Sequence, residues 1–222
     1  MKCKEIMVLV FVAFVFVTGL QYSQALQETV LDVEVVMELP QIALTFDDGP
    51  HPKYTSMLLD GLQERDVRVT FFIIGMYAAE HPEIIKRMHD EGHLLGNHTY
   101  NHVEITSLSN EEAYRELMDT SDLIYEITGA RTEFLRPPFG VWKKKLEEQV
   151  DVVPVLWTVD PLDWTTENAN EVVRKVVNEV EEGDIILLHD RYESSVNAAL
   201  RIVDILLEEG FEFVTVDELL MR

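Results

Sequence analysis

The chain has almost no cysteine and is short of positive charge. Its only cysteine is Cys3, so a disulfide within the chain is excluded and the fold must rest on its hydrophobic core. Against 41 aspartate and glutamate residues there are 18 lysine and arginine residues, which gives a formal net charge of -23. This acidity argues against nucleic acid as a partner, because binding to phosphates requires lysine and arginine, and it disfavours anionic membrane surfaces.

The chain has one long charge-free apolar run, and that run is short for a membrane span. It extends from Ile6 to Leu20, follows Lys2 and Lys4, and precedes the small-x-small sequence Ser23-Gln24-Ala25. This pattern predicts a secretory signal peptide over residues 1–25, with an uncleaved N-terminal anchor as the alternative. We therefore expect an exported protein, secreted or associated with the cell wall, or one anchored in the membrane through residues 6–20.

After a short lead-in over residues 26–39, apolar β-rich runs alternate with stretches of helical periodicity. The apolar runs include "QIALTF", "VRVTFFIIG", "VVPVLWTV", "DIILLH" and "FEFVTV". Continuous apolar strands between amphipathic helices predict a parallel sheet buried on both faces. About seven such units over residues 40–222 favour an α/β fold with a single barrel near the TIM type over an open doubly wound sheet.

Chemically active side chains follow five of the predicted strands, at the point where each strand should end. They are Asp47 and Asp48, Asn97 and His98, Arg136, Asp160 and Asp163, and His189 and Asp190. In barrels of this kind the chemistry collects at the C-terminal ends of the strands. A purely structural protein would use turn residues there, so this distribution predicts an active site.

Two histidines in "GHLLGNHTYNH", His98 and His102, have the i, i+4 spacing that places both rings within reach of one ion. His89 and His93 have the same spacing, but we expect the first to be solvated and the second to be a core histidine. The adjacent carboxylates of "TFDDGP" repel each other unless a positive charge lies near both. Two histidines and one aspartate leave an open coordination position, which is typical of a catalytic zinc site.

The motifs "TFDDGP", "HTYNH", "RPPFG", "DPLDW" and "ILLHD" follow one another in this order. Together they resemble the five motifs of the polysaccharide deacetylases, the NodB homology group or carbohydrate esterase family 4. The resemblance spans roughly residues 40–220. It implies a distorted (β/α)7 barrel and a metal-dependent enzyme that removes N-acetyl groups, and in some members O-acetyl groups, from glycans.

The resemblance also implies a role for each motif. Asp48, His98 and His102 would hold one divalent metal ion, zinc first, with cobalt or another divalent ion as alternatives. Asp47 would be the general base that accepts a proton from the attacking water. His189 would be the general acid that protonates the leaving amine.

Further residues would support these groups. Arg136 would orient the base, and Asp163 would orient the acid. The backbone N–H of Phe139, where the family usually has tyrosine, would complete the oxyanion site. Trp164 and the residues from Ile186 to Leu188 would shape the pocket for the acetyl methyl group. Trp157, inside a predicted strand, is expected in the core.

The leading hypothesis is an exported zinc-dependent enzyme that removes N-acetyl groups from N-acetylglucosamine residues of peptidoglycan, with chitin-type oligosaccharides second. An esterase acting on O-acetyl xylan would use the same residues, so this alternative stays open. A non-catalytic glycan-binding homologue would be expected to lack the base or the acid, and both are present. A metal phosphoesterase would need a second set of metal ligands, which the sequence does not offer. The expected partner is an acetylated glycan, and no stable protein partner can be inferred.

Overall fold

The structure is a computed structural model that describes residues 39–146 and 149–221. The predicted signal peptide and residues 26–38 of the predicted lead-in lie outside the described residues. From Leu39 onward the chain forms one compact unit. No helix within the described residues is long and apolar enough to cross a membrane.

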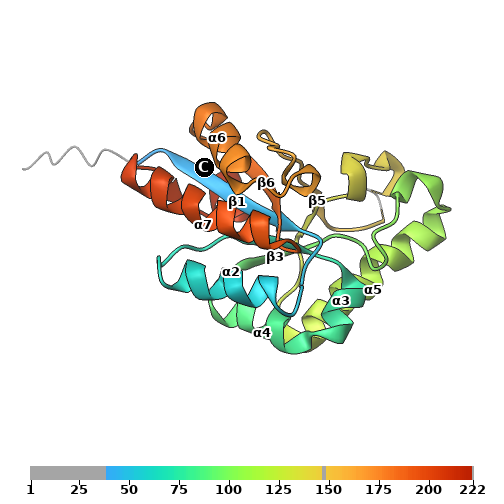
Figure 1. The fold of residues 1–222 in the computed structure, drawn as a ribbon. Helices are drawn as coiled ribbons and strands as arrows, with labels where there is room; N and C mark the ends of the chain where they lie inside the picture. Colours follow the sequence, from blue (N-terminus) through green and yellow to red (C-terminus); the bar gives the residue numbers. More distant parts are fainter. Residues whose placement is uncertain (1–38, 147–148, 222) are drawn as a thin grey trace, which may run out of the picture. The chain divides into compact units, whose positions relative to one another are not determined.

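A sheet of seven strands forms the centre of this unit, and all its strand pairs are parallel (Figure 1). The strands are β1 (Gln41–Asp47), β2 (Thr70–Ile73), β3 (Leu94–Asn97), β4 (Phe134–Leu135), β5 (Val153–Pro154), β6 (Ile185–His189) and β7 (Glu212–Phe213). Their order is β5-β4-β3-β2-β1-β6, and β7 pairs with the first two residues of β1. The predicted parallel sheet is confirmed.

The sheet approaches a barrel but does not close through a continuous strand ladder. The segment after β5 reaches β6 through a single bridge between Val159 and Ile186. There the Leu187 N–H donates to the Val159 oxygen at 3.0 Å. β5 ends at Pro154, which has no N–H to extend a ladder. The seven predicted strands are therefore present, and the distortion of the barrel lies at this junction.

Helices cover the sheet, but not after every strand. They are α2 (Tyr54–Gln63), α3 (Gly75–Glu80), α4 (Pro82–Asp90), α5 (Asn110–Thr128), α6 (Ala169–Glu179), α7 (Glu193–Glu208) and α8 (Val216–Leu220). Between β4 and β5 the described residues form only 3₁₀ turns, Pro138–Gly140 and Lys144–Leu146, so the predicted strand–helix alternation fails there. Pro138 disfavours the helical conformation in the residue before it, and Pro137 is extended with φ -70° and ψ 135°, so no helix begins directly at the end of β4.

The last predicted strand, "FEFVTV", is wrong over most of its length. Only Glu212–Phe213 is strand, and Val216 begins α8. A capping box between Thr215 and Glu218 starts this helix, and "TVDE" carries that signal in the sequence.

Successive side chains of β1 point to opposite faces of the sheet, one towards the hydrophobic core and the other towards the site residues. Ile42, Leu44 and Phe46 are fully buried in the cluster between the sheet and helices α2, α4, α6 and α7. Thr45 lies between Leu44 and Phe46, and Asp47 follows Phe46, so both face the opposite side, towards the interior of the distorted barrel. A buried polar face at the C-terminal end of β1 is where the site residues gather.

Candidate active site

Three side chains beyond the ends of β1 and β3 form a group able to hold one metal ion. Asp48 follows β1, and His98 and His102 follow β3; one ligand atom from each lies within 4.8 Å of the others. Asp48 Oδ1 is 3.4 Å from His98 Nε2 and 3.2 Å from His102 Nε2, and it is buried without a hydrogen-bond partner. A buried carboxylate oxygen without a partner, facing two imidazole nitrogens, fits a divalent cation. We refer to these residues as the metal triad.

The triad is prepared for coordination by its protonation states. His98 Nδ1 lies 2.6 Å from the Arg136 carbonyl oxygen, which can only accept, so Nδ1 carries the proton and Nε2 is free to bind a metal. Burial raises the pKa of Asp48, but the His98 and His102 rings outweigh it and lower the pKa to about 2. Burial also lowers the pKa of His102. An ionised carboxylate and neutral imidazoles are the forms that bind metals.

Beside the triad, Asp47 pairs with a fully buried arginine. Arg136 Nη1 donates to Asp47 Oδ1 at 2.8 Å and to Thr45 Oγ1 at 2.7 Å. The other nitrogens donate to backbone oxygens, Nη2 to Leu156 at 3.1 Å and Nε to Val155 at 3.3 Å. Four hydrogen bonds therefore fix the guanidinium group. Asp47 Oδ2 faces the triad, 3.7 Å from its nearest histidine nitrogen, and can accept a proton while Oδ1 stays bound.

At the end of β6, His189 pairs with Asp163. Its Nδ1 is 2.7 Å from Asp163 Oδ1, and its backbone N–H donates to Oδ2 of the same carboxylate at 2.9 Å. Burial lowers the pKa of His189, but the hydrogen bond and charge of Asp163, with the charges of Asp47 and Asp48, raise it to about 9. His189 is therefore protonated at neutral pH, and Nε2 is the ring nitrogen left for a substrate.

The metal triad, Asp47 and His189 border one cavity of about 330 Å³, which lies within the usual size range of ligand pockets. They form one part of its wall. Phe139, Trp157, Trp164 and Tyr192 form most of the remainder. We refer to this as the catalytic cavity. A cation site with a base on one side and an acid on the other can catalyse hydrolysis of the bond that joins an acyl group to a sugar, and the aromatic rings can contact that sugar.

Comparison with known proteins agrees with this chemistry. A family model for polysaccharide deacetylases matches residues 36–153. The chain belongs to the polysaccharide deacetylase family. The predicted resemblance is therefore confirmed.

Several members of the family are similar to this chain. The peptidoglycan-N-acetylmuramic acid deacetylase PdaC of Bacillus subtilis is 41% identical over 178 residues, which is 80% of this chain but 38% of PdaC. A peptidoglycan-N-acetylglucosamine deacetylase of Bacillus cereus is 36% identical over 198 residues, 84% of this chain and 92% of that protein. The chain thus spans well under half of the length of PdaC.

Solved structures show the same fold. The structure of PdaC matches with a TM-score of 0.80 at 40% identity, covering 82% of this chain and 90% of that one. A family 4 acetyl xylan esterase from Clostridium thermocellum, in complex with a cobalt ion, matches with a TM-score of 0.76 at 34% identity, covering 82% and 90%. The chain therefore has the fold of both a peptidoglycan deacetylase and an acetyl xylan esterase.

Two sequence predictions about the catalytic cavity need correction. Ile186 does not line it, because its side chain is fully buried in the cluster between the sheet and the helices, and Leu187 lines the cavity instead. Successive strand residues face opposite sides, and Leu187 shares the side of His189. The prediction for Trp157 was incomplete: it packs against a core cluster and also borders the cavity.

The segments that carry the site have an unusual backbone. Among the described residues six non-glycine residues have positive φ, and five of them lie in these segments: Asp48, Thr99, His102, Phe139 and Leu162. Phe139 has φ 61° and is 65% exposed. Its ring and the His102 ring meet edge to face, with 5.1 Å between the ring centres. Such conformations are costly for non-glycine residues and cluster at functional sites. The role of the Phe139 N–H as an oxyanion donor stays a prediction.

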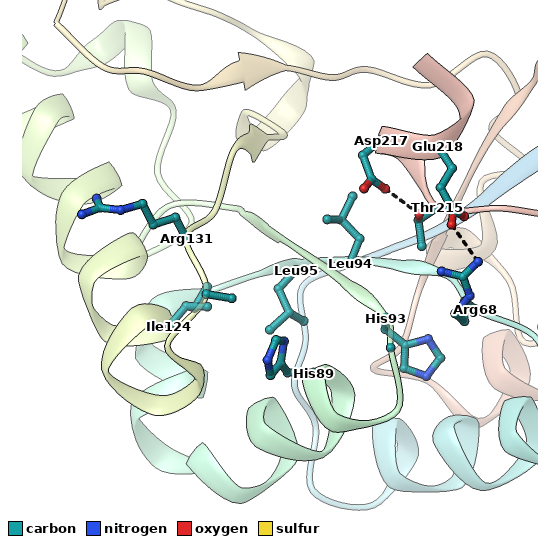
Figure 2. A pocket seen from close by; sticks show the side chains of 12 residues that line it. Arg68, His89, His93, Leu94, Leu95, Ile124, Arg131, Thr215, Asp217 and Glu218 are labelled. Carbon is teal, nitrogen blue, oxygen red and sulfur yellow. Dashed lines mark hydrogen bonds and ion pairs between the residues drawn. The ribbon is translucent and has the colours of Figure 1, made fainter. Parts of the chain in front are cut away.

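The other histidine pair lies in a separate cavity of about 280 Å³, next to the N-terminal ends of β2 and β3 (Figure 2). His93 Nδ1 accepts a hydrogen bond from the Val69 N–H at 3.2 Å, and burial lowers the pKa of His93 to about 4. The expectation of a core histidine is therefore confirmed. Arg68, in the same cavity, is paired with Glu218 at 2.7 Å. Among the described residues, the ligand-type cluster is the metal triad and not this pair.

We expect Asp163→Asn to move the alkaline limb of the kcat/KM profile to lower pH. An amide keeps one hydrogen bond to His189 but removes the negative charge, so the pKa of His189 falls. A general acid must be protonated, and activity is lost as the pH rises through its pKa. The shift would therefore appear as earlier loss of activity in pH–rate profiles of the two proteins. An unchanged alkaline limb would remove His189 from the role of acid.

Proposed function

We propose that this chain is an exported, zinc-dependent N-deacetylase that acts on N-acetylglucosamine residues of peptidoglycan. The observation that carries the proposal is that Asp47, paired with Arg136, and His189, paired with Asp163, border the same cavity as the metal triad. Relatives named as peptidoglycan deacetylases support peptidoglycan as the polymer. The apolar N-terminal run between lysines and a small-x-small sequence supports export.

The residues divide the reaction into two proton transfers. The metal triad would hold a divalent ion, which would act as a Lewis acid on the acetyl carbonyl. Asp47 accepts a proton from the attacking water through Oδ2 while Arg136 holds Oδ1. As the C–N bond breaks, His189 donates its Nε2 proton to the leaving amine, and Asp163 keeps the ring in position. The products are acetate and a free amine on the sugar.

Other groups stabilise the charge that develops and hold the acetyl group. The Phe139 N–H donates to the carbonyl oxygen as negative charge builds on it, which is the usual task of a backbone oxyanion donor. Trp157, Trp164 and Leu187 border the cavity and form an apolar surface for the acetyl methyl group.

A second candidate function is the removal of O-acetyl groups from xylan. The similarity to the acetyl xylan esterase of Clostridium thermocellum favours it, because an ester and an amide need the same ion, base and oxyanion donor. The leaving group of an ester is an alcohol and that of an amide is an amine. Protonation of the leaving group by His189 therefore matters to a different degree in the two reactions. The two functions are distinguished by the substrate from which acetate is released.

Acetate release by the full chain tests both functions and the metal together. The panel comprises peptidoglycan, N-acetylated chitooligosaccharides and acetylated xylan, each with zinc and with a chelator. We expect release from peptidoglycan with zinc, loss of release with the chelator, and recovery when zinc or cobalt is added back. Asp48→Ala, which lacks a triad ligand, should not recover.

The other outcomes are equally informative. Release that resists the chelator would contradict the metal site. Release from xylan alone would assign the esterase function. No release from any substrate by a folded, metal-loaded sample would favour a glycan-binding protein.

A further inference from the structure

One fully buried acid next to the general acid has no part in the chemistry described above. Asp190 directly follows His189, and its side chain is shielded from solvent. Its Oδ1 is buried without a hydrogen-bond partner in the part of the chain that the structure describes. Aspartate is seldom fully buried unless it is paired, because a carboxyl group loses its hydration there. What this carboxyl group contacts explains its position.

The Asp190 carboxyl group lies against the turn that follows Asp48, the aspartate of the metal triad. A Cβ atom added to Gly49 would lie 2.3 Å from Asp190 Oδ2 and 2.5 Å from Oδ1. The carboxyl group therefore occupies the space in which any other residue at position 49 would place its side chain. Such a close approach to the backbone is possible only at glycine.

The same carboxyl group connects this turn to the start of α2. Thr55 Oγ1 donates a hydrogen bond to Asp190 Oδ2 and accepts one from the His51 N–H at 2.7 Å. Thr55 is fully buried as well. Two hydrogen bonds in series therefore fix His51, three residues after Asp48, relative to the end of β6.

The backbone of Asp48 itself is held from the same segment. Arg191 Nη1 donates to the Asp48 backbone oxygen at 3.3 Å, and the guanidinium carbon lies 4.1 Å from the centre of the Tyr77 ring. Asp48 has φ 71°, a conformation that is costly for a residue with a side chain and that persists where the surroundings enforce it. Asp190 and Arg191 therefore contact the backbone on both sides of the peptide bond between Asp48 and Gly49.

We propose that Asp190 is a positioning residue of the metal site, which holds Asp48 where it completes the metal triad. This inference rests on the metal site of the proposed function. Asp190 does not line the catalytic cavity and acts through the turn. Because it follows His189, it also connects the end of the strand that carries the acid to the end of the strand that carries the metal ligand. Residues that orient metal ligands typically change metal affinity by about 10-fold to 100-fold when they are replaced.

The test measures zinc affinity by competition with a chromogenic chelator, and the melting temperature with and without zinc. Asp190→Ala removes the contact with Gly49 and the acceptor for Thr55, so we expect zinc binding to weaken by roughly 10-fold to 100-fold. Thr55→Val keeps the shape of the side chain but removes the hydrogen-bonded link, and should weaken it by roughly 2-fold to 10-fold. Asp190→Asn keeps the volume and an acceptor for Thr55, so it should restore zinc affinity to near the wild-type value.

Thr128→Val is the matched control. Thr128 Oγ1 also accepts a backbone N–H, from Ala130 at 3.1 Å, and donates to the Ile124 oxygen at 2.7 Å, but it lies at the C-terminal end of α5. We expect it to lower the melting temperature as Thr55→Val does and to leave zinc affinity unchanged. A residue with a purely structural role would lower the melting temperature equally with and without zinc. Loss of a positioning residue also reduces the rise in melting temperature that zinc produces.

Three results would overturn the inference: wild-type zinc affinity in folded Asp190→Ala, a loss in Thr128→Val as large as in Asp190→Ala, or a loss in Asp190→Asn as large as in Asp190→Ala. If Asp190→Ala does not fold, Thr55→Val compared with Thr128→Val decides in the same way. Failure of the proposed function looks different, because wild type would then bind zinc but release no acetate, and the zinc affinities would still decide. A wild type that binds no divalent ion would refute both the metal site and this inference.

Discussion

Asp47→Asn is expected to lower kcat by about 10²-fold to 10⁴-fold, the usual contribution of a general base. Asparagine keeps an oxygen that can accept the 2.8 Å hydrogen bond from Arg136, but it cannot take up a proton at neutral pH. Asp47 is not part of the metal triad, so the variant should still bind one zinc ion. The variant should therefore lose turnover while it keeps the zinc content of the wild type.

The measurements are kcat on the substrate that responds, zinc per chain by elemental analysis, and the melting temperature. Asp119→Asn makes the same chemical change at an exposed position of α5 and should leave all three near wild type. Near wild-type turnover in a folded, zinc-loaded Asp47→Asn protein would mean that another group is the base.

Arg136→Met is expected to reduce the free energy of unfolding by about 3–5 kcal/mol, because it leaves the Asp47 carboxylate buried without its partner. The Arg136 side chain is fully buried and links Asp47 to Thr45 and to two backbone oxygens. Turnover should fall as well, since the base loses the group that orients it. Urea unfolding followed by circular dichroism measures the first effect.

A second variant distinguishes the effect of the unpaired Asp47 charge from the effect of losing the packed Arg136 side chain. Adding Asp47→Asn to Arg136→Met removes the unpaired charge, so the double variant should recover most of the lost stability but none of the activity. Arg65 pairs with Asp204 at the surface at 2.7 Å, so Arg65→Met is the control and should cost less than about 1 kcal/mol. An Arg136→Met protein as stable as this control would show that the buried pair does not stabilise the fold.

Much of the site could be predicted from the sequence because its residues sit at strand ends. A parallel sheet brings those ends to one edge, so Asp48, His98 and His189 gather even though their strands are far apart in the sequence. Which face a residue takes was harder to predict. Residues 185–188 of "DIILLHD" are all apolar and show no alternation, so Ile186 and Leu187 look equivalent. Counting back from His189 in steps of two would have selected Leu187.

Other features depend on distances that no local pattern encodes. Thr45 holds Arg136 only because β1 and the end of β4 face each other across the interior of the distorted barrel. The single bridge between Val159 and Ile186 joins segments that are far apart in the sequence, so it too depends on the partner strand. By contrast, α8 had a readable signal in "TVDE", which the apolar residues before it obscured.

The left-handed backbone at the rim of the catalytic cavity limits which residues this chain can accept there as it diverges or is engineered. That conformation costs most L-residues roughly 1–2 kcal/mol, while glycine and asparagine adopt it readily. At Phe139, which is largely exposed, a library should therefore tolerate glycine or asparagine and reject valine or isoleucine. The tolerated residues would remove the aromatic contact with His102. Selection for thermostability and selection for substrate preference would then favour different residues at this one position.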